Sequence, residues 1–233
     1  MKKNDTLIII LAFNEAKSVG RVIDDLSRTY RSADILLIND GSLDDTSEAI
    51  QDREIFIVNH PFNLGIGASF ETGCQFALNY DYDYIVRMDA DGQHSADFVK
   101  SLLAPVKSGA ADIAIGSRFL GCSEFKASFF RLIGIFVLSN LISAITRKKV
   151  TDPTSGFCAM NKRAFEFFSR NCADDYPEPE ILVHHANFKI VEIPVSISKR
   201  ISGTSSITPL KSAYYMIKVL LSLFISFIGK EKK

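Results

Sequence analysis

Two aspartates stand almost side by side in the stretch RMDADGQH, which covers residues 87–94 and follows a short apolar run. Only Ala90 separates Asp89 from Asp91. Carboxylates this close repel each other unless a positive charge lies between them, and a bound cation is often the largest charge in a site. Oxygen ligands without thiolates suit Mg²⁺ or Mn²⁺. Because such pairs also occur in solvated turns, the position of this one after a buried strand is what favours a divalent metal site.

Polar residues follow other predicted strands in the same way. Glu15 follows the first strand, Asp40 the second and Arg118 the fifth. In parallel sheets, ligands bind beyond the carboxyl ends of the strands. Asp40 is placed to accept hydrogen bonds from a base or ribose, although an Asp-Gly-Ser sequence is also typical of a plain turn, with Asp44 capping the next helix. Glu15 has the simpler alternative of an acid at a helix start.

These residues are positioned by a pattern of apolar strands that alternate with amphipathic helices. The predicted strands are 6–12, 34–39, 55–58, 84–88 and 112–116, and the predicted helices are 16–30, 67–79 and 96–107. Continuous apolar strands separated by helices indicate an α/β fold with a mostly parallel, Rossmann-like sheet that helices cover on both faces. The Gly-rich stretch 63–69 follows the third strand and lacks a third glycine at its place, so it does not predict a dinucleotide-binding dehydrogenase.

Composition narrows the class of protein further. The 233 residues include 27 basic and 27 acidic side chains, so no net positive charge favours nucleic acid binding. No linker divides the chain, and we expect one catalytic domain over 1–206 with an appendage at 207–233. Four widely spaced cysteines and the lack of a signal-peptide core at the N-terminus favour the cytoplasm.

Two segments, 129–146 and 210–228, are apolar almost all round. Arg131 and Lys218 interrupt them, which disfavours a membrane span. We expect helices that lie in the membrane interface, where the basic tail 230–233 suits an anionic surface. A pair of buried core helices is the alternative.

Six motifs in order carry a resemblance to a known family. They are Ala-Phe-Asn-Glu at 12–15, Asn-Asp-Gly-Ser-Leu-Asp at 39–44, Asn-Leu-Gly-Ile-Gly at 63–67, Asp-Ala-Asp-Gly-Gln at 89–93, Gly-Ser-Arg at 116–118 and Asp-Pro-Thr-Ser-Gly-Phe at 152–157. From Leu7 to Ser206 the chain resembles family 2 glycosyltransferases of the GT-A fold, and within them the dolichol- or polyprenyl-phosphate mannosyl- and glucosyltransferases. It departs from the usual pattern at Leu11, Phe13 and Asn39, where proline, tyrosine and aspartate are common.

The resemblance implies roles for individual residues. Asp91, Asp152 and Arg118 would carry catalysis, with the metal, Mg²⁺ or Mn²⁺, on Asp89, Asp91 and Gln93. The nucleotide would contact Ala12, Phe13, Glu15, Asp40 and Asp89. Donor or acceptor phosphates would be addressed by Arg118, Arg131, Ser155, Lys199 and Arg200.

The resemblance also implies an inverting transfer of a hexose from UDP- or GDP-sugar to a polyprenyl phosphate at the inner face of the cytoplasmic membrane. A lipid phosphate is already anionic and needs no strong base, whereas a sugar hydroxyl would need one, for which Asp152, Glu178 and Glu180 are candidates. Transfer to such a hydroxyl is one alternative, and a catalytically silent nucleotide-binding module is another. We also expect a small integral membrane protein as a partner.

Overall fold

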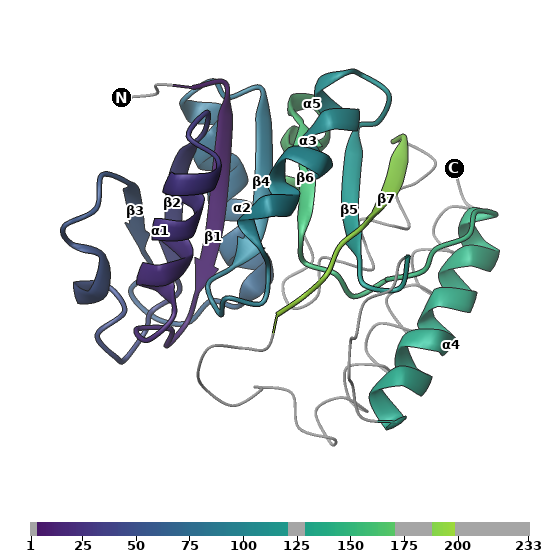
Figure 1. Cartoon of the computed structure of the whole chain (residues 1–233), viewed down its shortest axis with the longest axis horizontal. Helices are drawn as coiled ribbons and strands as arrows, with labels where there is room; N and C mark the ends of the chain where they lie inside the picture. The colour runs from purple at the N-terminus through teal and green to yellow at the C-terminus, as the bar shows by residue number, and fades with distance from the viewer. Residues whose placement is uncertain (1–3, 121–128, 171–187, 199–233) are drawn as a thin grey trace.

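The computed structural model of the chain describes residues 4–120, 129–170 and 188–198. Its centre is a seven-stranded sheet in the order β3-β2-β1-β4-β6-β5-β7 (Figure 1). The strands are β1 Thr6–Ala12, β2 Asp34–Asn39, β3 Phe56–Asn59, β4 Tyr84–Asp89, β5 Ile113–Ser117, β6 Cys158–Asn161 and β7 Ile190–Pro194. Within this sheet β6 pairs antiparallel with both neighbours and the other pairs are parallel, which confirms the mostly parallel sheet.

Helices cover both faces of the sheet, as the sequence predicts. They are α1 Val19–Thr29, α2 Ile66–Asn79, α3 Val99–Lys107, α4 Phe129–Thr146 and α5 Lys162–Phe168, with 3₁₀ turns at Glu48–Ile50 and Ala96–Phe98. The buried side chains of α1 and α3 belong to one hydrophobic cluster. Those of α2, α4 and α5 belong to the cluster on the opposite face.

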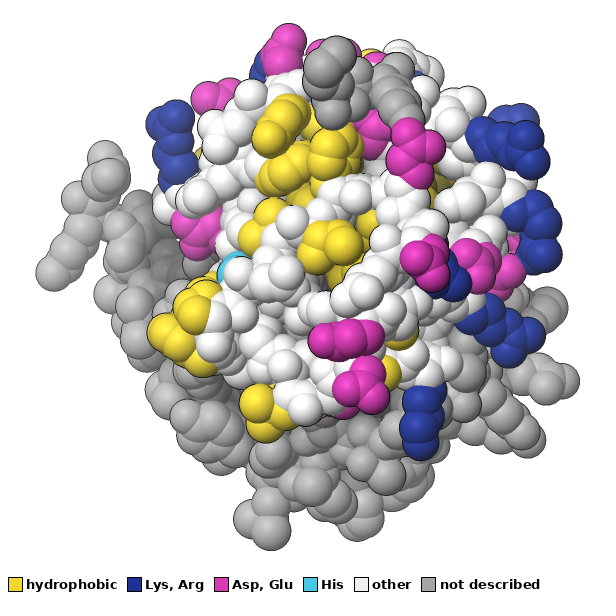
Figure 2. Space-filling view, turned by 90° about the vertical axis from the view of Figure 1, so that its left-hand side faces the viewer, with side chains coloured by type: hydrophobic (Ala, Val, Ile, Leu, Met, Phe, Trp, Pro, Cys, Tyr) yellow, Lys and Arg dark blue, Asp and Glu magenta, His cyan; other side chains and the backbone are white. Residues whose placement is uncertain are grey.

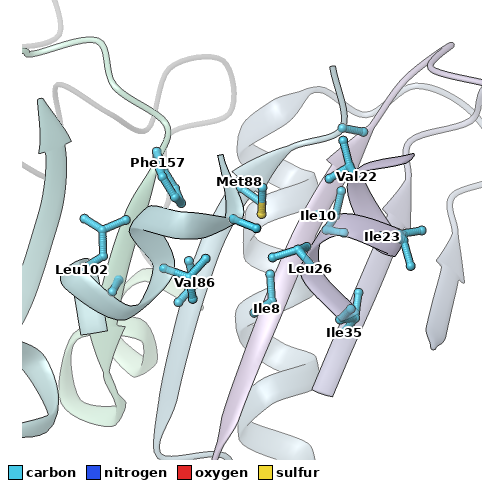
Figure 3. Packing of buried hydrophobic residues seen from close by; sticks show 14 of the residues in the cluster. Ile8, Ile10, Val22, Ile23, Leu26, Ile35, Val86, Met88, Leu102 and Phe157 are labelled. Carbon is cyan, nitrogen blue, oxygen red and sulfur yellow. The ribbon is translucent and has the colours of Figure 1, made fainter. Parts of the chain in front are cut away.

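Strand β1 shows why its sequence is a continuous apolar run. All seven of its residues are buried, because helices pack on both of its faces. Ile8 and Ile10 point into the cluster with Val22 and Leu26 of α1 (Figure 3), whereas Ile9 points into the cluster on the other face. The alternation of side chains along a strand thus divides one run of similar residues between two cores.

Strands β6 and β7 and helix α5 were not predicted. β6 has four residues, Cys158–Asn161, and such a short stretch carries no periodic signal that separates strand from helix. It enters the sheet between β4 and β5, where Val86 and Ala114 each lie opposite Ala159. Partners this distant in sequence are decided by the assembled sheet and not by local pattern.

Helix α4 has the predicted bounds and buries one of its sides in the core, while its place in a membrane interface stays a prediction. Leu138 and Ile142 are buried in the core, whereas Ile133, Phe136 and Val137 are exposed. In the part of the chain that the structure describes, no helix is both long and apolar enough to cross a membrane. The predicted helix at 210–228 lies outside the described residues.

The described sheet has two edge strands, β7 at one end and β3 at the other. The face of the molecule on that side carries apolar, acidic and basic side chains (Figure 2). Ile57, Phe62 and Leu64 are among the exposed apolar residues of β3 and of the loop that follows it.

The packing of α2 on β1 gives a stability prediction. A Cβ on Gly73 would lie 2.7 Å from Cγ2 of Ile9, a buried β-branched side chain. Overpacking costs about 1–3 kcal/mol, more than the gain of up to about 1 kcal/mol from a better helix former. We expect Gly73→Ala to lower the urea midpoint of unfolding. Asn79→Ala, at an exposed position of the same helix, is the control, and a Gly73→Ala midpoint at or above that of the wild type would contradict the packing.

Candidate active site

Residues 89–94 carry the predicted metal ligands, and we call them the metal loop; they begin at the last residue of β4. Asp91 is buried, and its Oδ1 accepts a hydrogen bond from the backbone N–H of Gln93 at 2.9 Å. Gly92 between them has φ +77°, a backbone conformation that glycine adopts without steric cost. The turn therefore orients the Asp91 carboxylate through a local hydrogen bond and places Gln93 beside it.

Asp89 differs from Asp91, because its Oδ1 is buried and has no hydrogen-bond partner within residues 4–120, 129–170 and 188–198. Leaving such an oxygen unsatisfied costs about 1–3 kcal/mol, and a bound cation would remove that cost. Among the described residues, no three or more His, Cys, Asp or Glu side chains are grouped so that they could hold a metal ion by themselves. A pair of carboxylates is nevertheless what Mg²⁺ or Mn²⁺ uses when substrate phosphates and water supply the remaining ligands. Asp89 and Asp91 fit such an ion.

His94 binds the backbone at the end of β4. Its Nδ1 accepts the backbone N–H of Asp89 at 3.2 Å, and its ring stacks on Phe157 with centroids 4.8 Å apart. Burial lowers the pKa of His94, and the charges of Asp89 and Asp91 oppose this effect. A neutral imidazole that accepts at Nδ1 keeps the Asp89 backbone in place.

Arg118 and Asp152 form a buried ion pair beside the metal loop. Nε and Nη2 of Arg118 donate to the two carboxylate oxygens of Asp152, each at 2.6 Å, and the Arg118 backbone N–H adds a third bond at 3.0 Å. Asp152 is fully buried, and the charge of Arg118 contributes to the lowered pKa of His94. Asp152 thus orients Arg118 in this structure, while its predicted role as a base stays a prediction.

The loops that follow β1 and β2 are joined to each other by hydrogen bonds. The backbone N–H of Asn14 donates to Ser42 Oγ at 2.9 Å, and Asn14 Oδ1 accepts the backbone N–H of Leu43 at 2.8 Å. Asp44 Oδ2 accepts the backbone N–H of Ala16 at 3.1 Å, and its Oδ1 accepts the backbone N–H of Thr46 at 3.2 Å in the turn before the 3₁₀ turn Glu48–Ile50. The predicted cap interaction is therefore made one turn early, since Ser47 is the N-cap of the 3₁₀ turn itself. The Asp44 carboxylate also ties the two loops together.

The residues expected at the nucleotide lie on these two loops. Ala12 is buried at the end of β1, and Phe13 is 42% exposed. Glu15 accepts a hydrogen bond from Ser18 Oγ at 2.7 Å. An exposed aromatic ring beside a strand end is suited to contact a flat base, and the nucleotide role of all three stays a prediction.

Asp40 holds the loop after β3 by three hydrogen bonds. Its carboxylate accepts His60 Nδ1–H at 2.7 Å and the backbone N–H groups of Leu64 and Gly65 at 2.9 and 3.0 Å. Asp40 is only 4% exposed. It therefore shapes the wall of the candidate nucleotide site, and direct contact with a nucleotide stays a prediction.

His60 was missed by the sequence analysis. Its second ring nitrogen, Nε2, lies 3.0 Å from Thr72 Oγ1 on helix α2. A lone histidine in the sequence carries no sign of such a connection, and only the fold brings Asp40 and Thr72 to its two sides.

Asn39, at a position where the family commonly has aspartate, donates from Nδ2 to Ser47 Oγ at 2.8 Å and to Asn59 Oδ1 at 3.0 Å. Its Oδ1 accepts the backbone N–H of Ser42. A carboxylate has no hydrogens to donate, so the amide suits these two acceptors. The departure from the family pattern is matched by its surroundings.

The remaining predicted residues are only partly placed. Ser155 is buried in the loop before β6. The Arg131 side chain, Lys199, Arg200, Glu178 and Glu180 lie outside the part of the chain that the structure describes. The structure therefore brings the predicted metal ligands and Arg118 to one edge of the sheet. The ends of the neighbouring strands β1 and β2 carry Ala12 and Asp40.

Comparison with known proteins identifies the class. The model of the glycosyl transferase family 2 matches residues 7–168, and the chain belongs to this family. The fold is also that of crystal structures of glucosyl-3-phosphoglycerate synthase from Mycobacterium tuberculosis. The complex with Mn²⁺ and UDP-glucose has a TM-score of 0.73 at 18% identity and covers 93% of this chain and 78% of that chain. The protein is a GT-A glycosyltransferase.

Individual relatives cover almost the whole chain. It is 30% identical to an uncharacterised protein of Methanocaldococcus jannaschii, over 93% of each chain. It is 27% identical to the polyprenol monophosphomannose synthase of Mycolicibacterium smegmatis, over 92% of this chain and 85% of the relative. A UDP-N-acetylglucosamine–dolichyl-phosphate N-acetylglucosaminyltransferase of Methanococcus voltae is 26% identical, over 81% of this chain and 83% of the relative.

The Arg118–Asp152 pair predicts a stability effect. In Asp152→Asn, one guanidinium donor would face an amide N–H₂ group in a buried site, and breaking a buried ion pair costs about 3–5 kcal/mol. We expect a large drop in the free energy of unfolding, measured by urea titration. Asp25→Asn, which removes an exposed partner of Arg28, is the control and should leave the midpoint unchanged. Equal midpoints for the two variants would show that the pair does not anchor Arg118.

Proposed function

We propose that the protein is an inverting, metal-dependent glycosyltransferase that moves a hexose from a UDP- or GDP-sugar to a polyprenyl phosphate at the cytoplasmic face of the membrane. The single observation that carries the donor half is the unpartnered Asp89 oxygen beside Asp91, next to the charge of Arg118. Support for the lipid phosphate acceptor comes from the names of the relatives in Mycolicibacterium smegmatis and Methanococcus voltae.

The donor half of the mechanism concerns the leaving diphosphate. Asp89, Asp91 and Gln93 would hold Mg²⁺ or Mn²⁺, which when bound neutralises negative charge on phosphate oxygens. Arg118 is held by Asp152 in a fixed orientation, and a pre-oriented guanidinium stabilises charge as it develops without further reorganisation. Phe13 and the loops around Asp40 would hold the nucleoside.

The surroundings of the Asp152 carboxylate bear on the nature of the acceptor. Both of its oxygens accept hydrogen bonds from Arg118, and the side chain is fully buried. A carboxylate in this arrangement is poorly placed to remove a proton from a hydroxyl. An acceptor that is already anionic, such as a lipid phosphate, requires no proton transfer. For Asp152, among the predicted bases, this supports a phosphate acceptor over a sugar hydroxyl, while Glu178 and Glu180 lie outside the described residues.

Membrane attachment is supported by the outer face of α4. Ile133, Phe136 and Val137 are exposed on it, and the exposed Lys148 and Lys149 follow its end. Exposed apolar side chains next to lysines suit an anionic membrane interface. A small integral membrane protein as partner remains part of the proposal and concerns the segment 207–233.

The acceptor is tested by its product. Membranes that contain the protein are incubated with radiolabelled UDP- and GDP-hexoses, and the label is extracted into organic solvent. We expect a lipid product that mild acid cleaves, because the sugar is joined through a phosphate. Label that appears only in acid-stable glycan would instead indicate a hydroxyl acceptor.

The metal site is tested by Asp91→Ala. Removal of this ligand should lower Mn²⁺-dependent binding of a nucleoside diphosphate by at least about 100-fold in calorimetry and abolish transfer. Asp83→Ala, just before the opposite end of β4, is the matched control and should bind like the wild type. Unchanged Mn²⁺-dependent binding by Asp91→Ala would remove the metal assignment.

A further inference from the structure

Glu192 on β7 is an acidic side chain that the proposed chemistry does not use. Its neighbours along the strand, Val191 and Ile193, pack against the hydrophobic cluster of α1 and α3. Side chains alternate along a strand, so Glu192 points to the other face. Its strand pairs with β5, which ends in Ser117.

The carboxylate of Glu192 binds the backbone of the loop that carries Asp152. Its two oxygens accept the backbone N–H of Thr151 at 3.0 Å, and Oε1 also accepts the backbone N–H of Asp152 at 2.9 Å. Oε2 accepts Thr151 Oγ1–H at 3.0 Å. With both oxygens engaged, Glu192 is a positioning residue and not a proton acceptor.

The loop held by Glu192 in turn holds Arg118. Asp152 binds the Arg118 guanidinium through both oxygens, and Thr154 Oγ1 accepts a further bond from Nη2 at 2.7 Å. Thr151 Oγ1 lies 2.6 Å from Ser117 Oγ, one residue before Arg118. The position of the guanidinium is therefore set by a chain of contacts that ends on β7.

The same segment continues to the metal loop. After Pro194, the backbone N–H of Val195 donates to Ser117 O at 3.0 Å, and Ile197 forms a β-bridge with His94. The backbone N–H of Ser198 then donates to Gln93 O at 3.0 Å. We call residues 190–198 the β7 segment. In one continuous stretch it contacts Ser117, which precedes Arg118, the backbone of Thr151 and Asp152, and the metal loop.

We propose that the β7 segment fixes the separation between Arg118 and the Asp89–Asp91 loop, with Glu192 as the positioning residue on the arginine side. The proposal deepens the proposed function and rests on it for its kinetic consequences. Misplacement of a group by about 1 Å can reduce a rate about 100-fold. A displaced Arg118 would therefore slow transfer, whereas the metal loop keeps its own local turn and continues to bind the nucleotide.

The first test is the kinetics of Glu192→Ala. We expect kcat for transfer to fall about 10–100-fold, while the Mn²⁺-dependent Kd for the intact nucleotide sugar, in which the charge of the leaving diphosphate has not yet developed, stays within about threefold of the wild-type value. Glu166→Ala, which removes an exposed glutamate of α5, is the control and should match the wild type in both. A folded Glu192→Ala protein with wild-type kcat, or with kcat and nucleotide affinity reduced in the same proportion, would overturn the proposal.

A second variant covers the case in which Glu192→Ala does not fold. Thr151→Val keeps the backbone contacts and removes only the hydroxyl between Glu192 and Ser117. Thr151→Val should lower kcat less than Glu192→Ala does. In the double variant Thr151→Val/Glu192→Gln, the loss of kcat should be smaller than the two single losses combined, because both residues act through the same loop. Fully additive losses would contradict a shared path to Arg118.

A third measurement does not depend on the acceptor. In protein labelled with ¹⁵N-arginine, the Nε–H signal of Arg118 is assigned by its absence in Arg118→Lys. It should exchange slowly with solvent in the wild type and in Glu166→Ala, and faster in Glu192→Gln. If the wild type transfers no sugar to polyprenyl phosphate, the proposed function fails while this signal still decides the role of Glu192. Equal exchange in all three proteins would overturn that role.

Discussion

The arrangement of this site depends on a buried carboxylate oxygen at the end of a buried strand, for which the described residues supply no hydrogen-bond partner. Asp89 ends β4, the turn at Gly92 orients Asp91 two residues later, and Asp89 Oδ1 has no hydrogen-bond partner among the residues that the structure describes. Burying such a group is costly unless a positive charge completes it. In the function proposed above, a divalent cation with a diphosphate would meet this need, and Arg118 would add a second positive charge.

The residues around this centre act mostly by holding one another. Asp40 was expected from its position to contact a nucleotide. In the structure its carboxylate accepts three hydrogen bonds from the loop after β3. Asp152, expected as a base, holds Arg118. In both cases a carboxylate next to the site serves to fix a neighbouring group in place. Preorganisation of this kind is what transition-state stabilisation requires, since groups that are already oriented need no reorganisation during the reaction.

The parts of the fold that the sequence predicted are those in which one segment carries its own signal. Strand β1 has seven buried residues, six of them apolar, and helix α2 repeats its apolar positions at helical spacing, so both were found with nearly correct bounds. β6 and β7 were missed because each is short and gains its stability from partners far away, such as Ile85 opposite Met160. The strand order, with β6 between β4 and β5, cannot be read from any local pattern.

By itself, the sequence determined the family, the mostly parallel sheet and the edge on which Asp89, Asp91 and Arg118 meet, because motif order and strand periodicity are local properties of the chain. Only the tertiary structure decided which of the acids stay available. Asp89 keeps a buried oxygen for which the described part of the chain offers no hydrogen-bond partner. Asp40 and Asp152 instead bind His60 and Arg118, and Glu192 of β7 binds the backbone of Asp152. Hydrogen bonds between residues 20 to 41 positions apart depend on how strands are placed side by side, and spacing along the chain does not encode that placement.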